Sequence, residues 1–179
     1  MVVADSSRPE QEVTSGQTDR PDTCGAQYAG FRLEVHDLPD ERAVRYARAR
    51  VREVLRNSDA GDGDIHDAEL AVCELATNAV AHGAGPYEIR FAMIGERPIW
   101  CEIVDGDDDL AGVPEIIDKL HQTDVSECAA NEVPQDNGHG LAIVHHLSGG
   151  RCRAYRTVLS STGRPGKAVA FALPGSRPP

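Results

Sequence analysis

CELATNAVAHG, residues 73–83, ends a stretch of sequence with the periodicity of a helix. The apolar side chains of this stretch recur at steps of three and four residues, so one stripe of the helix is expected to pack inward. Asp64 is the expected N-cap, and the helix is expected to end at His82 and Gly83. The stripe comprises Ile65, Ala68, Val72, Leu75 and Ala79.

The polar residues Glu74, Asn78 and His82 recur every four residues on this helix, so they share a face turned away from the apolar stripe. Such a face can simply be solvated. Asn78, however, is a poor choice inside a helix, and a locally unfavourable residue is a hint of a site. An amide oxygen beside a carboxylate suits Mg²⁺ and a proton acceptor.

Downstream of this helix, residues 86–94 and 97–105 read as two strands joined by a short turn through Gly95, which is typical of an antiparallel hairpin. The second strand ends at Asp105, which is followed by Gly106. An acid at the end of a buried apolar strand is either a turn former or an acceptor for a ligand.

A second glycine-containing segment, DNGHGLAIVHHL, places Gly138 and Gly140 just before a short helix that extends to Leu147. Glycines let the backbone approach a ligand closely, and the free N–H groups and dipole of a helix start attract phosphate. Ordinary junctions between a loop and a helix use glycine too, so the pattern alone leaves both interpretations open.

The remaining sequence predicts an α+β two-layer sandwich, in which a mixed, largely antiparallel sheet is covered on one face by helices. Residues 1–27 have almost no large apolar side chains and are expected to be a disordered tail. The domain is expected over 28–174 and a C-terminal tail over 175–179. Within the domain we expect a first strand at 28–36, a helix after Pro39, a lid over 106–137 with a short helix at 114–121, and closing strands at 151–159 and 167–174.

Composition restricts the class of function. The chain has 179 residues and a net charge of −11, which argues against binding a nucleic-acid backbone. No apolar run approaches the roughly 20 residues of a membrane span, and no secretory signal is readable, so a cytoplasmic protein is expected. The five cysteines lack the spacing of a zinc or redox motif. Only Lys119 and Lys167 are lysines, and the segment 105–136 carries ten acids against Lys119 alone.

Three segments together resemble the ATPase superfamily shared by DNA gyrase, the heat-shock chaperone ATPase, bacterial histidine kinases and MutL-type repair proteins. Residues 73–83 resemble its N-box, IVDGDDD at 103–109 occupies the G1 position, and GHGLAIVHHLS at 138–148 resembles the G2 box, in the family's order and spacing. The nearest branch is that of anti-sigma-factor serine/threonine kinases of the SpoIIAB and RsbW kind. The resemblance covers roughly 28–174 and implies the histidine-kinase-like ATPase fold.

The resemblance also implies site residues, with ATP and Mg²⁺ as cofactors. Asn78 would bind the Mg²⁺ that bridges the ATP phosphates, and Glu74 would be the general base on the attacking hydroxyl. Asp105 would accept a hydrogen bond from the adenine amino group. The phosphates would meet the G2 segment, whose ATP-binding residues are Gly138, His139, Gly140 and Leu141.

The implied function is a kinase that phosphorylates a serine of an anti-sigma factor antagonist and, without that antagonist, sequesters a sigma factor. Two departures from the family pattern keep alternatives open: Gly106 follows Asp105 directly and precedes three aspartates, and His139 stands where Arg is frequent. The alternatives are a non-catalytic nucleotide-binding interaction module and an ATP hydrolase without a protein substrate. A homodimer, common in the family, would be compatible with the apolar face of the first helix.

Overall fold

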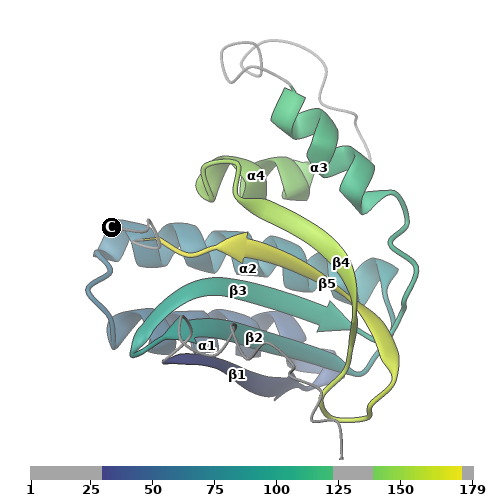
Figure 1. The fold of residues 1–179 in the computed structure, drawn as a ribbon, viewed down its shortest axis with the longest axis horizontal. Coiled ribbons are helices and arrows are strands. Elements are labelled where there is room, and N and C mark those ends of the chain that lie inside the picture. Colours follow the sequence, from purple (N-terminus) through teal and green to yellow (C-terminus); the bar gives the residue numbers. More distant parts are fainter. Residues whose placement is uncertain (1–29, 123–138, 175–179) are drawn as a thin grey trace, which may run out of the picture.

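The computed structural model describes residues 30–122 and 139–174. These residues form two layers, an open sheet and a pair of helices that lie across one of its faces (Figure 1). The expected tails at 1–27 and 175–179, the latter half of the expected lid and Gly138 lie outside the described residues.

The sheet contains five strands in the order β1-β2-β3-β5-β4. Each neighbouring pair of these strands is antiparallel, so the described sheet contains no parallel pair. The two hairpins expected from sequence are β2–β3 and β4–β5, and β5 joins them by pairing with β3. The strands are β1 (Phe31–Leu38), β2 (Tyr87–Ile94), β3 (Arg97–Asp105), β4 (Cys152–Val158) and β5 (Pro165–Ala172).

Two long helices, α1 (Ala43–Arg56) and α2 (Asp62–His82), pack side by side against the sheet (Figure 1). A 3-10 turn, η1 (Asp40–Arg42), separates Pro39 from α1. The apolar stripes of both helices meet alternate side chains of the strands, as their sequence periods require. The resulting core includes Ala47, Val51, Leu55, Val72, Leu75, Ile89, Phe91, Ile103 and Phe171.

Asp64 is not the N-cap of α2, contrary to the expectation from sequence. The helix begins at Asp62 and its N-cap is Gly61. Asp64 is the third residue of the helix, in its first turn, where its carboxylate accepts the N–H of Gly61 at 3.3 Å. An acid in the first helical turn satisfies a free backbone donor just as an N-cap side chain would, so the sequence pattern was displaced by one turn.

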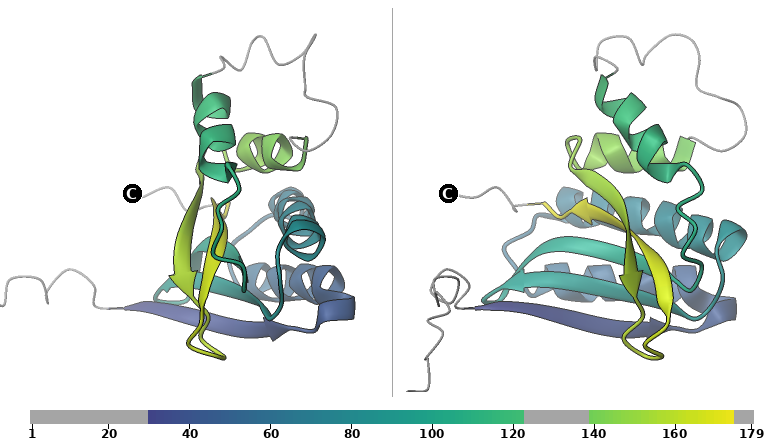
Figure 2. Two further views of the ribbon diagram at one scale, coloured as in Figure 1. Left: turned by 90° about the vertical axis from the view of Figure 1, so that its right-hand side faces the viewer. Right: turned by 45° about the vertical axis from the view of Figure 1, so that its right-hand side comes forward.

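Two shorter helices, α3 (Val113–Gln122) and α4 (His139–Leu147), lie beyond the β4 end of the sheet (Figure 2). α4 packs against α2, while α3 packs against α4 and β4. The segment between these two helices is the part of the expected lid that lies outside the described residues. This arrangement brings the start of α4 to the polar face of α2.

The opposite face of the sheet carries a buried ion pair between Glu88 and Arg90, at 2.7 Å. The β4–β5 hairpin covers this pair: Ser161 donates its backbone N–H and its hydroxyl to Glu88, each at 2.9 Å. Arg90 donates to the hydroxyl of Thr157 at 3.2 Å and to the carbonyl of Val158 at 2.6 Å. The tip of the hairpin is therefore anchored to β2 by charged groups. None of the described helices is long and apolar enough to cross a membrane.

Candidate functional site

Glu74 and Asn78 lie one turn apart on α2, and both are only partly buried. The start of α4 lies directly over them: a Cβ added to Gly140 would be 2.9 Å from Glu74 Oε2 and 3.3 Å from Asn78 Nδ2. A side chain at this position would displace the end of the Glu74 side chain, so glycine allows this close approach without such a shift.

The first turn of α4 supplies the backbone donors of this cluster. His139 is its first residue and is exposed, whereas the side chain of Leu141 is 5% exposed and anchors the turn in the core. The first N–H groups of a helix have no intrahelical partner, and with the dipole they favour an anion. Of the expected ATP-binding residues, Gly140 is thus brought beside Glu74 and Asn78, and His139 and Leu141 are its neighbours in the first turn of α4. Gly138 lies outside the described residues.

A second cluster surrounds Asp105 at the end of β3. The Asp105 carboxylate is almost fully buried and accepts two hydrogen bonds at Oδ1, from Lys167 Nζ at 3.0 Å and from the backbone N–H of Asp107 at 3.0 Å. Gly83, just past α2, lies against it: an added Cβ would be 2.5 Å from the carboxyl carbon. Asp105 is therefore clamped between the end of α2 and strand β5.

The charges in this cluster are coupled. Burial raises the pKa of Asp105, and hydrogen bonds from Lys167 and from the backbone of Asp107 and Ala84 oppose that rise. Burial alone would lower the pKa of Lys167, but its hydrogen bonds to Asp107 and Asp105 outweigh this effect and the pKa is raised. Lys167 is thus a cation at neutral pH, and it is the group that favours the ionised form of Asp105.

Helix α2 connects the two clusters. Gly83 lies nine positions after Glu74, which corresponds to about 13 Å along the helix axis.

Lys167 and Gly83 were not assigned a role from sequence, although both contact Asp105. A signal for Lys167 existed, because it is one of only two lysines in the chain. Its partners lie 60 and 62 residues away in sequence, so the ion cluster depends on the pairing of β3 with β5.

The donor set fits a Mg²⁺–nucleotide complex better than a metal held by the protein alone. Among the described residues, no group of three or more His, Cys, Asp or Glu side chains could hold a metal ion. Mg²⁺ typically takes one or two protein oxygens and completes its shell with phosphate oxygens and water. Asn78 and Glu74 beside the start of α4 supply such a partial set.

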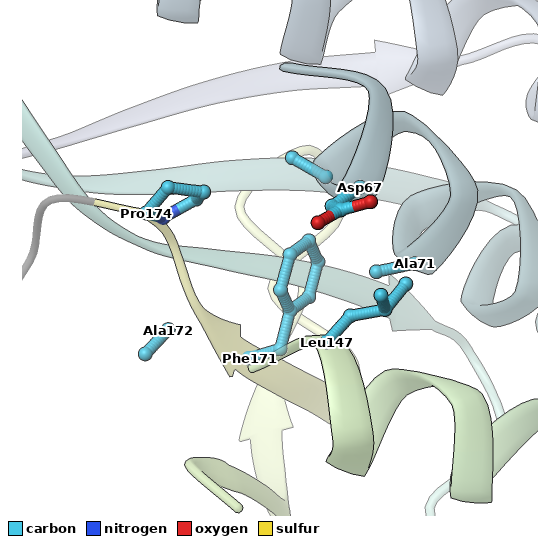
Figure 3. Close-up of a pocket in the computed structure, with 7 residues that line it drawn as sticks. Asp67, Ala71, Leu147, Phe171, Ala172 and Pro174 are labelled. Carbon is cyan, nitrogen blue, oxygen red and sulfur yellow. The ribbon is translucent and has the colours of Figure 1, made fainter. Parts of the chain in front are cut away.

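Two cavities within the described ranges lie away from these clusters. A shallow hollow of about 230 Å³ on the outer face of α1 is lined by Arg42, Arg45, Tyr46 and Ala49. A cavity of about 10 Å³ lies between α2, α4 and β5, and Phe171 and Leu147 are among the residues that line it (Figure 3). The second could hold at most one water molecule, so it is a packing gap rather than a ligand site.

The two-layer fold and the paired clusters together define a class of nucleotide-binding ATPases. The chain matches the family described as the histidine kinase-like ATPase domain over residues 38–157, and it belongs to that family. This match confirms the superfamily that the three motifs predicted.

Among solved structures, the fold is similar to that of a chain in the crystal structure of the SiaB-SiaC complex from Pseudomonas aeruginosa. The TM-score is 0.57 at 16% sequence identity, and the alignment covers 78% of this chain and 89% of that chain. At this identity the likeness shows the fold alone. No curated protein matches the chain.

Proposed function

We propose that this protein is a cytoplasmic, ATP-binding regulatory kinase that transfers the γ-phosphate of MgATP to a serine of an anti-sigma factor antagonist and otherwise sequesters a sigma factor. Family membership supports ATP binding. The observation that carries the proposal is the approach of the Gly140 backbone to Glu74 and Asn78, because it places a carboxylate, an amide and free N–H groups together. Asp105 would accept the adenine amino group at the other end of the site.

In the proposed reaction, Glu74 takes the proton of the serine hydroxyl as its oxygen bonds to the γ-phosphorus. The bond between that phosphorus and the β–γ bridging oxygen breaks, and ADP leaves with the electron pair. Asn78 would hold Mg²⁺, which neutralises phosphate charge when bound. The backbone N–H groups of Gly140 and Leu141 would orient the phosphates against the carboxylate.

Two observations support a protein partner. The structurally similar chain comes from a SiaB-SiaC complex. On this chain, α1 presents an exposed hollow that is lined by arginine and tyrosine, which are enriched in protein interfaces. The partner itself, whether antagonist or sigma factor, belongs to the proposal.

The test is calorimetry with MgATP followed by transfer of labelled phosphate to a candidate antagonist. We expect wild type to bind and transfer, Asn78→Ala to lose most of its affinity, and Glu74→Ala to bind but not transfer. Asp67→Ala, an exposed carboxylate of the same helix, is the matched control and should behave as wild type. Equal binding by Asn78→Ala and wild type would refute the assignment of the site.

The alternative is a non-catalytic module that binds nucleotide and acts through protein contacts. The observation in its favour is the G1 segment, which is shaped by aspartates instead of glycines: Asp105, Asp107 and Asp109 each accept the N–H two residues further on. Binding of MgATP without transfer to any antagonist would favour this module. Steady phosphate release without an acceptor would instead indicate a hydrolase.

A homodimer remains part of the proposal, but the surface expected from sequence is wrong. The apolar face of α1 is buried in the core, with Val51 and Leu55 fully covered. One group of exposed apolar side chains lies on β1 and at the end of β2, where Phe31, Leu33 and Ile94 are each about half exposed. Leu33→Asp is therefore the variant that should convert a dimer to a monomer in light scattering.

A further inference from the structure

Lys167 is a buried cation at the base end of the proposed nucleotide site, and it is 6% exposed. Its ammonium lies 3.0 Å from Asp105 Oδ1, 2.9 Å from Asp107 Oδ2 and 3.4 Å from the carbonyl oxygen of Asp107. An ammonium has three N–H donors, so these three oxygens satisfy it completely. Lys167 has no donor left for a ligand.

The choice of lysine at this position is informative. Arginine supplies almost all the positive charge of the chain, since only two of its 18 cationic residues are lysine. Lys167 on β5 lies directly across from Asp105 on β3. An ammonium is a compact point charge with three donors, and here it meets three oxygens. A buried lysine is stable only when it is paired, so Lys167 and Asp105 form one unit.

The remaining capacity of Asp105 can be counted. An ionised carboxylate offers about four acceptor positions. Lys167 and the backbone N–H of Asp107 occupy two of them, both at Oδ1. About two acceptor positions are left, and the ionised group has no donor of its own.

We propose that Lys167 is a positioning residue that fixes the base selectivity of the site, by holding Asp105 as an acceptor-only group that takes a 6-amino purine and rejects a 6-oxo purine. This inference rests on the proposed nucleotide-binding function. Adenine offers an N–H donor at its 6-position, which one free acceptor of Asp105 satisfies. Guanine offers a carbonyl oxygen there, which would face a buried carboxylate oxygen without a proton between them.

Removal of the Lys167 cation should weaken the preference of the site for a 6-amino purine. Without Lys167, burial favours the protonated form of the Asp105 carboxyl. A protonated Asp105 can donate its O–H to the carbonyl of guanine. The selectivity of the site should then relax. A purely structural role for Lys167 would weaken the binding of both nucleotides alike.

The experiment measures dissociation constants for MgATP and MgGTP by calorimetry at neutral pH on the full chain. Wild type is expected to prefer ATP, and in Lys167→Met the ratio of the two constants should fall by about tenfold or more, the worth of one hydrogen bond to a charged group. Lys119→Met is the matched control, because it makes the same change at the other lysine of the chain, on α3 and outside the Asp105 cluster; its ratio should remain that of wild type.

A double variant checks that Lys167 acts through Asp105. In an Asp105→Asn background, Lys167→Met should leave the ratio unchanged, since coupled residues are not additive. If Lys167→Met fails to fold, Lys167→Gln, which is neutral but still donates, should give the same relaxed ratio.

The outcomes separate this inference from the proposed function. If wild type binds neither nucleotide, the proposed function fails. If wild type prefers ATP and the folded Lys167 variants keep its ratio, the role of Lys167 is refuted while nucleotide binding stands.

Discussion

Gly140 brings a helix start against Glu74 and Asn78 with no side chain between them. A methyl group at this position would meet the mobile end of the Glu74 side chain, which can move aside. The added methyl group would therefore displace the Glu74 carboxylate and leave the fold largely unchanged.

We accordingly expect Gly140→Ala to change the free energy of unfolding by less than about 1 kcal/mol, since alanine also favours the helix. Phosphate transfer should fall by about tenfold or more, because displacement of a catalytic group by about 1 Å can cost that much or more. Urea titration and the transfer assay measure the two effects. Gly63→Ala, where an added Cβ meets nothing within 4 Å, is the control and should leave transfer unchanged. Full activity in Gly140→Ala would contradict this view of the site.

At the scale of single residues, the sequence marked Asn78 as a residue that disfavours the helix that contains it. The structure brings Asn78 beside the start of α4, and its role in a site stays a prediction. Lys167 is notable in the sequence only as one of two lysines, and no local pattern shows that it is buried. Only the fold reveals that its charge must be paired.

At the scale of elements, Glu69 joins the two long helices. It is almost fully buried on α2 and accepts hydrogen bonds from Arg52 and Arg48 of α1. The hydrogen bond from Arg52 is the largest influence on this carboxyl, and it lowers the pKa of Glu69 below the ordinary 4.5.

The stability that Glu69 contributes is therefore fully present above pH 4.5 and is lost as the pH falls through its lower folded pKa. At neutral pH, Glu69→Gln should reduce the free energy of unfolding by about 1 kcal/mol, since solvent screens the half-exposed arginines. The difference from wild type should shrink in acid. Urea titrations over a pH series measure it, and Glu53→Gln, in the exposed pair with Arg50, should show no such trend. A constant difference down to low pH would contradict this account.

The anchoring of the β4–β5 hairpin by the ion pair of Glu88 and Arg90 can be tested in the same way. Glu88 is fully buried and is the partner of Arg90. Glu88→Gln should destabilise the protein by about 3 kcal/mol, because a buried guanidinium loses its counter-ion. Denaturant unfolding measures the loss. Glu96→Gln, whose side chain is 93% exposed beside Arg32, should show no measurable change. If the two variants unfolded alike, the hairpin anchor would contribute nothing.

Most elements follow from local patterns, and the exceptions have physical reasons. Alternating apolar residues predicted β2 and β3 with nearly the observed ends, since both strands lie in the core. The predicted start of α2 differs from the observed start, because an acid in the first helical turn and an acid at the N-cap produce similar sequence patterns. The ion pair of Glu88 and Arg90 was not foreseen, because charged residues in a strand normally indicate a solvated face.

At the scale of the whole molecule, nucleotide binding should appear as global stability. At a MgATP concentration of a hundred dissociation constants, the free energy of unfolding should rise by about 2.7 kcal/mol. For a chain of this size that corresponds to an increase in Tm of about 5–10 °C. Differential scanning fluorimetry measures the shift, and Asn78→Ala should show almost none. An unchanged Tm for wild type at saturating MgATP would argue against a site in the native state.

The architecture was predicted as a sheet with helices on one face, and this was confirmed, but the strand order was not predicted. Strand β5 inserts between β3 and β4, a long-range pairing that no local pattern encodes. That insertion brings Lys167 opposite Asp105. The pairing of Lys167 with Asp105 and the strand order were therefore not predicted for the same reason, because both depend on the pairing of β5 with β3.

The register of β5 on β3 therefore determines which residue lies across from Asp105, as well as how the two strands pair. A slip of one residue would put Gly166 or Ala168 across from Asp105 and turn the ammonium to the opposite side of the sheet. Insertions or deletions within β5 would then abolish discrimination between purines even in a protein that still folds, whereas length changes in the 159–164 turn would spare it.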